Sequence, residues 1–259
     1  IFLDDADFAN AVSRGTKHMF NITGQSCNAP SRMLVPESRQ AEAKEAAKKV
    51  ADELIVGDPS SEETVMGPVV SDVQFNKIQG LIEKGIEEGA EVVVGGLGKP
   101  EGLNQGYFVK PTVLVTKDPK YITMEKELFG PIVTVYIYDD KDYSKVLKLV
   151  DTTSEYALTG AIFAKDRYAI KEALDKLENS AGNFYINDKP SGAVVGQQPF
   201  GGARASGTND KAGSKLNLLR WVSPRLIKEP LLTPKDYKYP FLGWDIKNHF
   251  LMFIENLPI

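Results

Sequence analysis

Apolar residues recur every three or four positions in several segments, a spacing typical of helices with one buried face. The segment after residue 71 also opens with a capping box, in which Ser71 and Gln74 can satisfy free backbone groups of the first turn. The pattern predicts amphipathic helices at about residues 7–20, 43–54, 71–86, 143–150 and 167–177.

Short runs rich in β-branched and aromatic residues alternate with these helices and predict strands. The alternation predicts an α/β fold, with a mostly parallel sheet flanked by helices. Pro111 interrupts one run, and a proline cannot donate to a neighbouring strand, so we expect that strand at a sheet edge. The predicted strands lie at residues 1–3, 91–94, 108–115, 132–138, 158–164 and 183–186.

The C-terminal part of the chain lacks this periodicity. Residues 188–213 are rich in Gly, Ser, Ala, Asn and Gln and predict a long functional loop. A strand-like stretch then runs from residue 218 to 227, and a proline- and aromatic-rich tail follows Pro240. We therefore divide the chain into a main domain, residues 1–217, and a C-terminal strand and tail, residues 218–259.

Composition narrows the class of protein. Apolar residues make up 42% of the 259 residues, enough for a buried core, and the net charge is −4 without a basic stripe. We expect no nucleic-acid partner and no membrane segment, and a single cysteine excludes an internal disulfide. His18 and His249 lie far apart without further ligands at suitable spacing, so no metal site is expected. The default compartment is the cytoplasm.

The lone cysteine, Cys27, is the first candidate for chemistry. Taken alone, a single cysteine is more often a small buried apolar residue than a nucleophile. Cys27, however, lies among small and polar residues, which fill a core poorly and let a substrate carbonyl approach the sulfur.

The residues around Cys27 match the signature Phe-x-x-x-Gly-Gln-x-Cys, with an Arg five residues after the cysteine. Two further segments follow in the same order as in the family that carries this signature. By these segments the chain resembles the aldehyde dehydrogenase superfamily, and the resemblance covers most of its length. The matching residues are Phe20, Gly24, Gln25, Cys27 and Arg32, then Glu127-Leu128-Phe129-Gly130-Pro131, then Pro199-Phe200-Gly201-Gly202.

This resemblance implies the fold of an aldehyde dehydrogenase catalytic domain and a role for each segment. Cys27 would attack an aldehyde and form a thiohemiacetal and then a thioester, while the hydride passes to NAD. Glu127 would hold the nicotinamide ribose hydroxyls, because a carboxylate can accept from both, and Phe129 would pack beside the ring. The implied cofactor is NAD, with NADP as the alternative.

The second half resembles one branch of the superfamily more closely. Residues 181–189 and 192–211 look like the 1-pyrroline-5-carboxylate dehydrogenases, which oxidise L-glutamate γ-semialdehyde to glutamate in proline breakdown. The resemblance implies that backbone N–H groups of Gly192 and Ala193 bind the substrate α-carboxylate and that Phe200 packs on its methylene groups. Backbone donors in a Gly-rich loop suit a carboxylate.

The first half departs from that branch. Its members typically carry Gln-Lys-Cys-Ser around the nucleophile, with the Ser helping to hold the α-carboxylate, whereas this chain has Gln25-Ser26-Cys27-Asn28. Asn28 could donate to the carboxylate instead. Residues 1–115 look more like general aldehyde dehydrogenases, so a broad-specificity enzyme is the alternative.

Part of the family's machinery has no counterpart in this sequence. The chain opens without a methionine, and no G-x-G-x-x-G loop precedes Cys27. We expect it to begin inside a longer protein whose upstream part holds the NAD-binding domain, the oxyanion Asn and the general-base Glu. The chain alone is then predicted neither to bind NAD tightly nor to turn over.

The resemblance also implies assembly. Members of the family pair through the catalytic domain and a C-terminal strand, here residues 218–227, which predicts a homo-oligomer. A non-catalytic assembly module is the alternative from another class, and the intact Cys27 argues against it. We interpret the aromatic residues after Pro240 as a docking segment. In a eukaryote, the expected compartment is the mitochondrial matrix.

Overall fold

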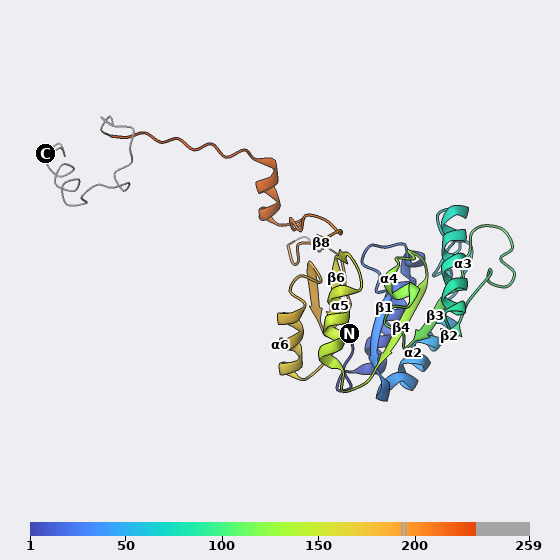
Figure 1. Ribbon diagram of the computed structural model, residues 1–259. Coiled ribbons are helices and arrows are strands. Elements are labelled where there is room, and N and C mark those ends of the chain that lie inside the picture. Colours follow the sequence, from blue (N-terminus) through green and yellow to red (C-terminus); the bar gives the residue numbers. More distant parts are fainter. Residues whose placement is uncertain (193, 195, 232–259) are drawn as a thin grey trace. The chain divides into compact units, whose positions relative to one another are not determined.

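The computed structural model describes residues 1–192, 194 and 196–231, and the chain divides into two compact units, Ile1–Arg220 and Trp221–Ile259. Helices and strands alternate along the first unit, and its largest sheet is mainly parallel (Figure 1). The predicted α/β class is therefore confirmed. Among the described residues, no helix is long and apolar enough to cross a membrane.

The largest sheet has the strand order β1-β4-β3-β2. Strands β1 (Arg32–Pro36), β4 (Ile132–Tyr138) and β3 (Thr112–Thr116) run parallel, and β2 (Glu91–Val94) pairs with β3 in the antiparallel sense. The predicted edge position of the 108–115 strand is wrong, because β3 lies between β4 and β2. Pro111 precedes β3, so its missing N–H falls outside the ladder.

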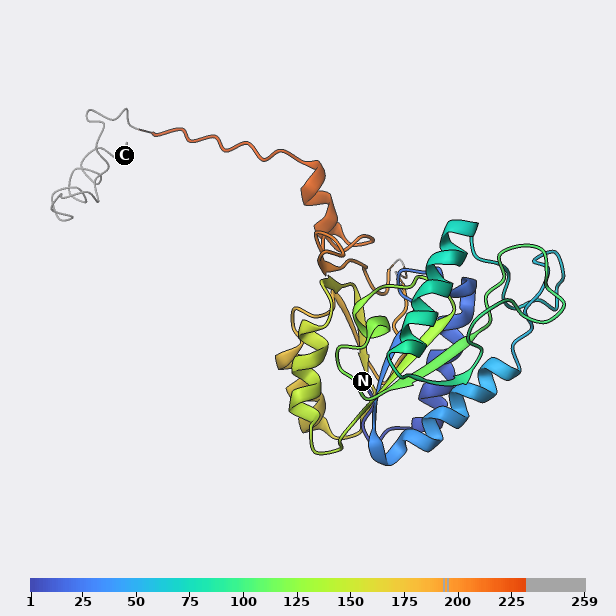
Figure 2. The ribbon, with the colours of Figure 1, turned by 45° about the vertical axis from the view of Figure 1, so that its right-hand side comes forward.

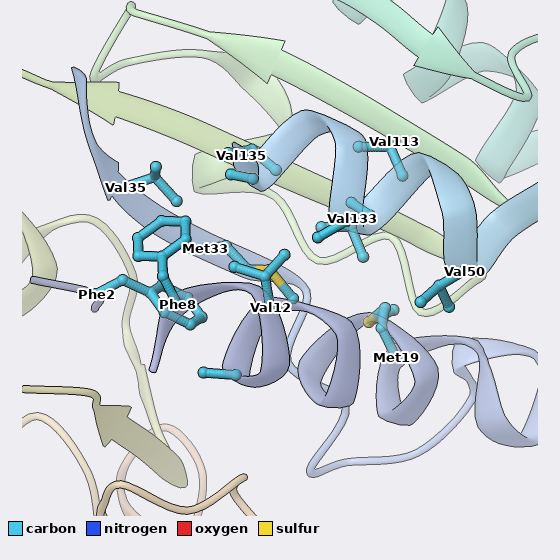
Figure 3. Close-up of a cluster of buried hydrophobic side chains, with 14 of the residues drawn as sticks. Phe2, Phe8, Val12, Met19, Met33, Val35, Val50, Val113, Val133 and Val135 are labelled. Carbon is cyan, nitrogen blue, oxygen red and sulfur yellow. The ribbon is translucent and has the colours of Figure 1, made fainter. Parts of the chain in front are cut away.

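Both faces of this sheet are covered by helices. One face packs against α1 (Phe8–Phe20) and α2 (Gln40–Asp52), as Figure 3 shows. The opposite face packs against α3 (Asp72–Glu87) and the short α4 (Ile122–Glu125) (Figure 2). Buried residues of the first layer include Phe8, Val12, Met19, Met33, Val35, Val50, Val113, Val133 and Val135, and those of the second include Leu34, Ile78, Ile82, Leu114 and Ile132.

A smaller parallel pair, β6 (Thr159–Ile162) and β7 (Asn183–Ile186), has its own core beneath α5 (Tyr143–Thr152) and α6 (Arg167–Lys176). The remaining elements are short. They are the antiparallel pair β5 (Tyr156–Ala157) and β8 (Ala203–Arg204), and the 3-10 turns η1 (Asn21–Gly24), η2 (Glu37–Arg39) and η3 (Lys215–Trp221).

The first three residues connect the two parallel sheets. The N–H of Phe2 donates to the Leu34 carbonyl of β1 at 2.9 Å. On the other side, the Leu3 N–H donates to the Phe163 carbonyl and the Phe163 N–H donates to the Ile1 carbonyl, each at 2.9 Å. The Phe2 ring stacks on Phe163 with 4.9 Å between centroids, and Tyr138 donates its hydroxyl to the Phe2 carbonyl at 2.6 Å. The predicted strand at residues 1–3 is present as a single bridge between the sheets.

The C-terminal part differs from the prediction. Residues 215–221 form a 3-10 turn, and residues 222–231 contain no helix or strand. The strand predicted at residues 218–227 is therefore not formed within this single chain, because a strand needs a hydrogen-bonding partner and none of the described strands pairs there. The tail after Pro240 lies outside the described residues.

Replacing Phe2 should test the junction between the sheets. Its side chain is 4% exposed, so Phe2→Ala should lower the free energy of unfolding by about 3–5 kcal/mol. Urea denaturation followed by circular dichroism measures this loss. Tyr168→Ala, at a residue 86% exposed, is the control and should change stability by less than about 0.5 kcal/mol. A loss at Phe2 no larger than at Tyr168 would contradict the role of the junction.

Candidate active site

Cys27 lies in an exposed turn after the C-terminus of α1. The chain reverses through η1, where Ile22, Thr23 and Gly24 all have positive φ. Ala29 then donates its N–H to the Ser26 carbonyl at 3.0 Å, which closes a tight turn around the cysteine. The predicted nucleophile is thus presented to solvent on an irregular but hydrogen-bonded loop.

The Cys27 loop is in direct contact with the loop that carries Glu127 and Phe129. A methyl group on Gly24 would place its carbon 2.2 Å from the Gly130 carbonyl oxygen, a distance that no pair of such atoms tolerates. Gly24 also has φ +68°, in the left-handed region that favours glycine. Two of the sequence segments that predict the site therefore meet backbone to backbone.

Gln74, in the first turn of α3, also holds the Glu127 loop. Its Nε2 donates to the carbonyls of Leu128 at 2.9 Å and Phe129 at 2.8 Å. The Ser71 half of the predicted capping box is confirmed, since Ser71 Oγ accepts from the Gln74 N–H at 3.2 Å. The Gln74 side chain, by contrast, serves the loop. Sequence reasoning missed this role because the capping pattern explained the residue already.

Glu127 and Phe129 both face solvent from this loop. The Glu127 side chain is exposed, and Phe129 is 37% exposed with φ +56°. A non-glycine residue held at positive φ, together with an outward-facing apolar ring, is typical of a loop kept in shape for a ligand.

Arg32, the arginine of the Cys27 signature, points toward the same segment. Its Nη2 donates to the Glu125 carbonyl at 3.4 Å, a long contact. Burial lowers the pKa of Arg32, and the nearby Glu127 carboxylate opposes that shift. The signature arginine therefore lies close to the predicted cofactor carboxylate. Gln25 is used elsewhere, because its Oε1 accepts from the Val70 N–H at 3.0 Å.

The Gly192–Phe200 loop is held at its start by side-chain hydrogen bonds. Gln198 Nε2 donates to the Gly192 carbonyl at 2.7 Å and to Ser191 Oγ at 2.9 Å. Tyr185 donates its hydroxyl to the Ser191 carbonyl at 2.8 Å. Ala193, a predicted ligand of the carboxylate, lies outside the described residues.

The end of this loop is held by Asn183 and Lys211, two residues that sequence reasoning did not single out. Asn183 donates to the Pro199 carbonyl at 2.9 Å and accepts from the Gly201 N–H at 3.2 Å. Lys211 Nζ donates to the Gly201 carbonyl at 3.1 Å and to the Gly182 carbonyl, and burial lowers its pKa. Phe200, half-buried between these contacts, exchanges backbone hydrogen bonds with Ala212.

The Gly192–Phe200 loop also approaches the Cys27 loop. A methyl group on Gly192 would lie 3.8 Å from Asn28 Nδ2, so these two predicted substrate residues are neighbours. On α1, Arg14 forms a 2.9 Å ion pair with Asp188. Burial lowers the pKa of His18, and the charge of Lys189 lowers it further. Hydrogen bonds with the backbone of Pro190 and Asn28 offset part of this shift.

This arrangement combines three chemical capabilities. An exposed thiol can attack an electrophilic carbon, and the side-chain amide of Asn28 beside it can donate to an anion. An exposed carboxylate and ring lie on a loop fixed to the thiol loop through Gly24 and Gly130. Among the described residues, no cluster of His, Cys, Asp and Glu could hold a metal ion.

Comparison with known proteins gives consistent matches. Residues 1–225 match the aldehyde dehydrogenase family. Delta-1-pyrroline-5-carboxylate dehydrogenase, mitochondrial, of Dictyostelium discoideum is 45% identical over 92% of this chain and 42% of its own length. The chain thus spans less than half the length of the curated relatives it matches.

Two solved structures resemble the fold closely. The Delta-pyrroline-5-carboxylate dehydrogenase of Mycobacterium tuberculosis, solved with NAD and cobalamin, is 41% identical with a TM-score of 0.77, over 93% of this chain and 44% of its own. Aldehyde dehydrogenase C of Pseudomonas syringae, a C291A mutant solved with NAD+ and octanal, is 36% identical with a TM-score of 0.72, over 80% and 41%.

Gly24→Ala should disturb the contact between the two loops. Gly89→Ala is a matched control, because Gly89 also has positive φ but its added methyl group meets nothing within 4 Å. Both variants pay for the strained backbone, and only Gly24→Ala must also move Gly130. It should therefore lose about 1–3 kcal/mol more than the control in urea denaturation. Equal losses would show that the contact contributes nothing.

His18 should make stability depend on pH. The pKa of His18 is lower in the folded chain than in the unfolded one. The contribution of neutral His18 to the free energy of unfolding is therefore complete above the unfolded pKa of about 6.5 and is lost as the pH falls through the folded pKa. The free energy of unfolding should therefore fall more between pH 7.5 and 5.5 in the wild-type chain than in His18→Gln. The carboxylates titrate in both chains, so the difference isolates His18; parallel losses would contradict it.

Proposed function

The chain belongs to the aldehyde dehydrogenase family, and on that premise we propose that it is the catalytic domain of an NAD-dependent enzyme that oxidises L-glutamate γ-semialdehyde to glutamate in proline degradation. One observation carries the proposal: the turn that presents Cys27 is followed by Asn28, whose amide faces Gly192 of the predicted carboxylate-binding loop. The proposed nucleophile and the proposed anion-binding loop are thus neighbours, which suits a substrate with an aldehyde at one end and a carboxylate at the other.

Cys27 is proposed as the nucleophile. Its sulfur forms a bond to the aldehyde carbon, and the carbonyl oxygen takes up the negative charge near the backbone N–H groups of the turn. Once the hydride has left the carbon, Cys27 holds the acyl group as a thioester. Water then releases the carboxylate and restores the thiol. The exposure of Cys27 supports this role, because both the aldehyde and the water must reach the sulfur.

Glu127 and Phe129 fit the nicotinamide end of NAD, which supplies the hydride acceptor when it is bound. Glu127 is an exposed carboxylate that can accept from two ribose hydroxyls, and the Phe129 ring is free to pack on a planar group. Gln74 and Gly130 hold the loop in shape before any ligand arrives. The same residues fit NADP equally well.

The substrate proposal rests on the Gly192–Phe200 loop and on the relatives. Gln198 and Lys211 hold the two ends of the loop before any ligand arrives, which supports a binding role for it. Relatives at 41–46% identity carry the name delta-1-pyrroline-5-carboxylate dehydrogenase, several of them with the word mitochondrial. We propose a cytoplasmic location, or the mitochondrial matrix if the protein is eukaryotic.

Broad specificity toward aldehydes is the second candidate activity. Asn28 replaces the Ser that the glutamate semialdehyde branch carries, and the Pseudomonas syringae relative was solved with octanal, an aldehyde without a carboxylate.

We also propose a homo-oligomer. Several apolar side chains of the C-terminal part are largely exposed, which supports burial against a second copy; they include Leu216, Leu218, Leu219, Leu226 and Ile227.

Labelling by iodoacetamide tests Cys27 in the 259-residue chain. A thiol that attacks an aldehyde in turnover must be more nucleophilic than an ordinary thiol, so we expect Cys27 at pH 7 to react faster than free cysteine, as measured by mass spectrometry. Because Cys27 is the only cysteine, Cys27→Ala gives the background directly. A rate no greater than that of free cysteine would favour the non-catalytic assembly module.

A calorimetric titration of the same chain with NAD tests the cofactor part. We expect no micromolar affinity, because no G-x-G-x-x-G loop precedes Cys27 to bind the pyrophosphate. Micromolar binding would overturn the view that the nicotinamide contacts of Glu127 and Phe129 are only part of the NAD site.

A further inference from the structure

The ammonium group of Lys211 lies where three stretches of the chain meet. Its Nζ donates to the carbonyl of Gly201 at 3.1 Å, to the carbonyl of Gly182, and to Asn183 Oδ1 at 3.4 Å. Gly182 and Asn183 stand at the start of β7, and Gly201 directly follows the Gly192–Phe200 loop. One charged group therefore joins the sheet to the end of the proposed substrate loop.

The oxygens around this ammonium are all uncharged. Asp210, the neighbouring acid, binds Arg220 at 2.7 Å instead, and no carboxylate in the part of the chain that the structure describes forms an ion pair with Lys211. Burial lowers the pKa of Lys211, because no anion opposes the loss of water around the ammonium. A cation held by carbonyl oxygens is the arrangement of a monovalent-ion site, in which these oxygens replace the water shell.

Main-chain crowding makes a positive charge necessary at this point. A methyl group on Gly182 would place its carbon 1.9 Å from the Gly201 carbonyl oxygen, so the two backbones are in direct contact. Both carbonyls direct their oxygens toward the same ammonium. Without that ammonium, two acceptors would lie close together without a donor, which is destabilising. The end of the loop would then move away from β7.

The same contact determines the position of Phe200. Gly201 follows Phe200 in the chain, and Ala212, which follows Lys211, exchanges backbone hydrogen bonds with Phe200 at 2.9 and 2.8 Å. Phe200 is thus held through its own backbone and through its neighbour. Because Phe200 is the residue proposed to pack on the methylene groups of the substrate, its placement bears on binding.

We propose that Lys211 acts as a built-in monovalent cation, which fills the cage formed by the oxygens of Gly182, Asn183 and Gly201 and thereby positions Phe200 against the aliphatic part of the substrate. The inference rests on the proposed function. Lys211 is a positioning residue, because it acts through Phe200. Its charge carries the role, since a neutral side chain of the same length fills the space and leaves the carbonyl oxygens unpaired.

Rescue by an added cation tests the cage without any substrate. Lys211→Ala removes three methylene groups and the ammonium, which propylammonium can replace. We expect about 0.2 M propylammonium chloride to raise the melting temperature of Lys211→Ala by about 2–4 °C and to leave that of the wild-type chain unchanged. Tetramethylammonium chloride, which has no N–H donor, and propan-1-ol, which has no charge, are the controls. A rise no larger than with these controls would overturn the inference.

Protection of Cys27 tests the effect on the substrate. An aldehyde adds reversibly to the thiol: a sulfur–carbon bond forms, the carbonyl oxygen takes up the thiol proton, and no oxidant is consumed. The adduct blocks iodoacetamide, so the concentration that halves labelling of the 259-residue chain, relative to that for free cysteine, measures binding. 5-Oxopentanoate carries three methylene groups toward Phe200, whereas acetaldehyde ends beside the sulfur. We expect the wild-type chain to prefer 5-oxopentanoate by about tenfold.

The variants separate charge from packing. Lys211→Met keeps the length of the side chain without its charge and should reduce the preference about tenfold while leaving protection by acetaldehyde unchanged. Lys211→Gln keeps neutral donors and should lose less, and it provides the same comparison where Lys211→Met does not fold. Lys176→Met, at an exposed residue at the end of α6, is the matched control and should behave as the wild-type chain.

The possible failures are distinguishable. An unchanged preference in the Lys211 variants would overturn the inference and leave the proposed function standing. Equal loss of protection by both aldehydes in these variants would also overturn it, since the change would then lie in the Cys27 turn. Equal protection of the wild-type chain by the two aldehydes would overturn the proposed substrate, and the inference with it. Circular dichroism of each variant confirms that the compared chains are folded.

Discussion

The backbone contact between Gly24 and Gly130 is the constraint on which the geometry of the site depends. Gly24 lies three residues before the proposed nucleophile, Cys27, and Gly130 follows Phe129 of the proposed cofactor loop. A Cβ atom on Gly24 would collide with the Gly130 carbonyl oxygen. Because main-chain atoms cannot adopt new rotamers, this contact fixes the distance between the loops more firmly than side-chain packing would. The hydrogen bonds from Arg32 and Gln74 then hold a loop that already contacts the Cys27 loop.

Uncharged amide side chains, more than ion pairs, hold the loops of the site. Gln74, Asn183 and Gln198 each bond to main-chain groups that lie outside helices and strands. An amide can both donate and accept, so it satisfies irregular backbone without leaving a charge behind. Lys211 is the exception, and its lowered pKa reflects the burial of an ammonium among carbonyl groups. Glu127, the proposed cofactor carboxylate, is thereby left exposed.

The sequence predicted the helices and most strands well because their period is local. Asn183–Ile186 and the Phe8–Phe20 helix follow directly from apolar spacing. The order of strands is not local, and Pro111 misled the prediction because its effect depends on whether the ladder begins before or after it. Likewise, Gln74 matched a local capping pattern while its side chain serves a loop remote in sequence. The site was predicted residue by residue through resemblance, whereas its supports follow only from three-dimensional contacts.

Helix α1 links the core to the site, because one of its faces packs on the sheet and another contacts a loop of the site. Phe8, Val12 and Met19 pack on the sheet, whereas Arg14 and His18, one turn apart, contact the loop that begins at Asp188. The C-terminus of the helix leads straight into the Cys27 turn. A shift of α1 on the sheet would therefore act on both the Cys27 turn and the segment that begins at Asp188. Packing of one amphipathic helix thus keeps the two ends of the proposed substrate site in register.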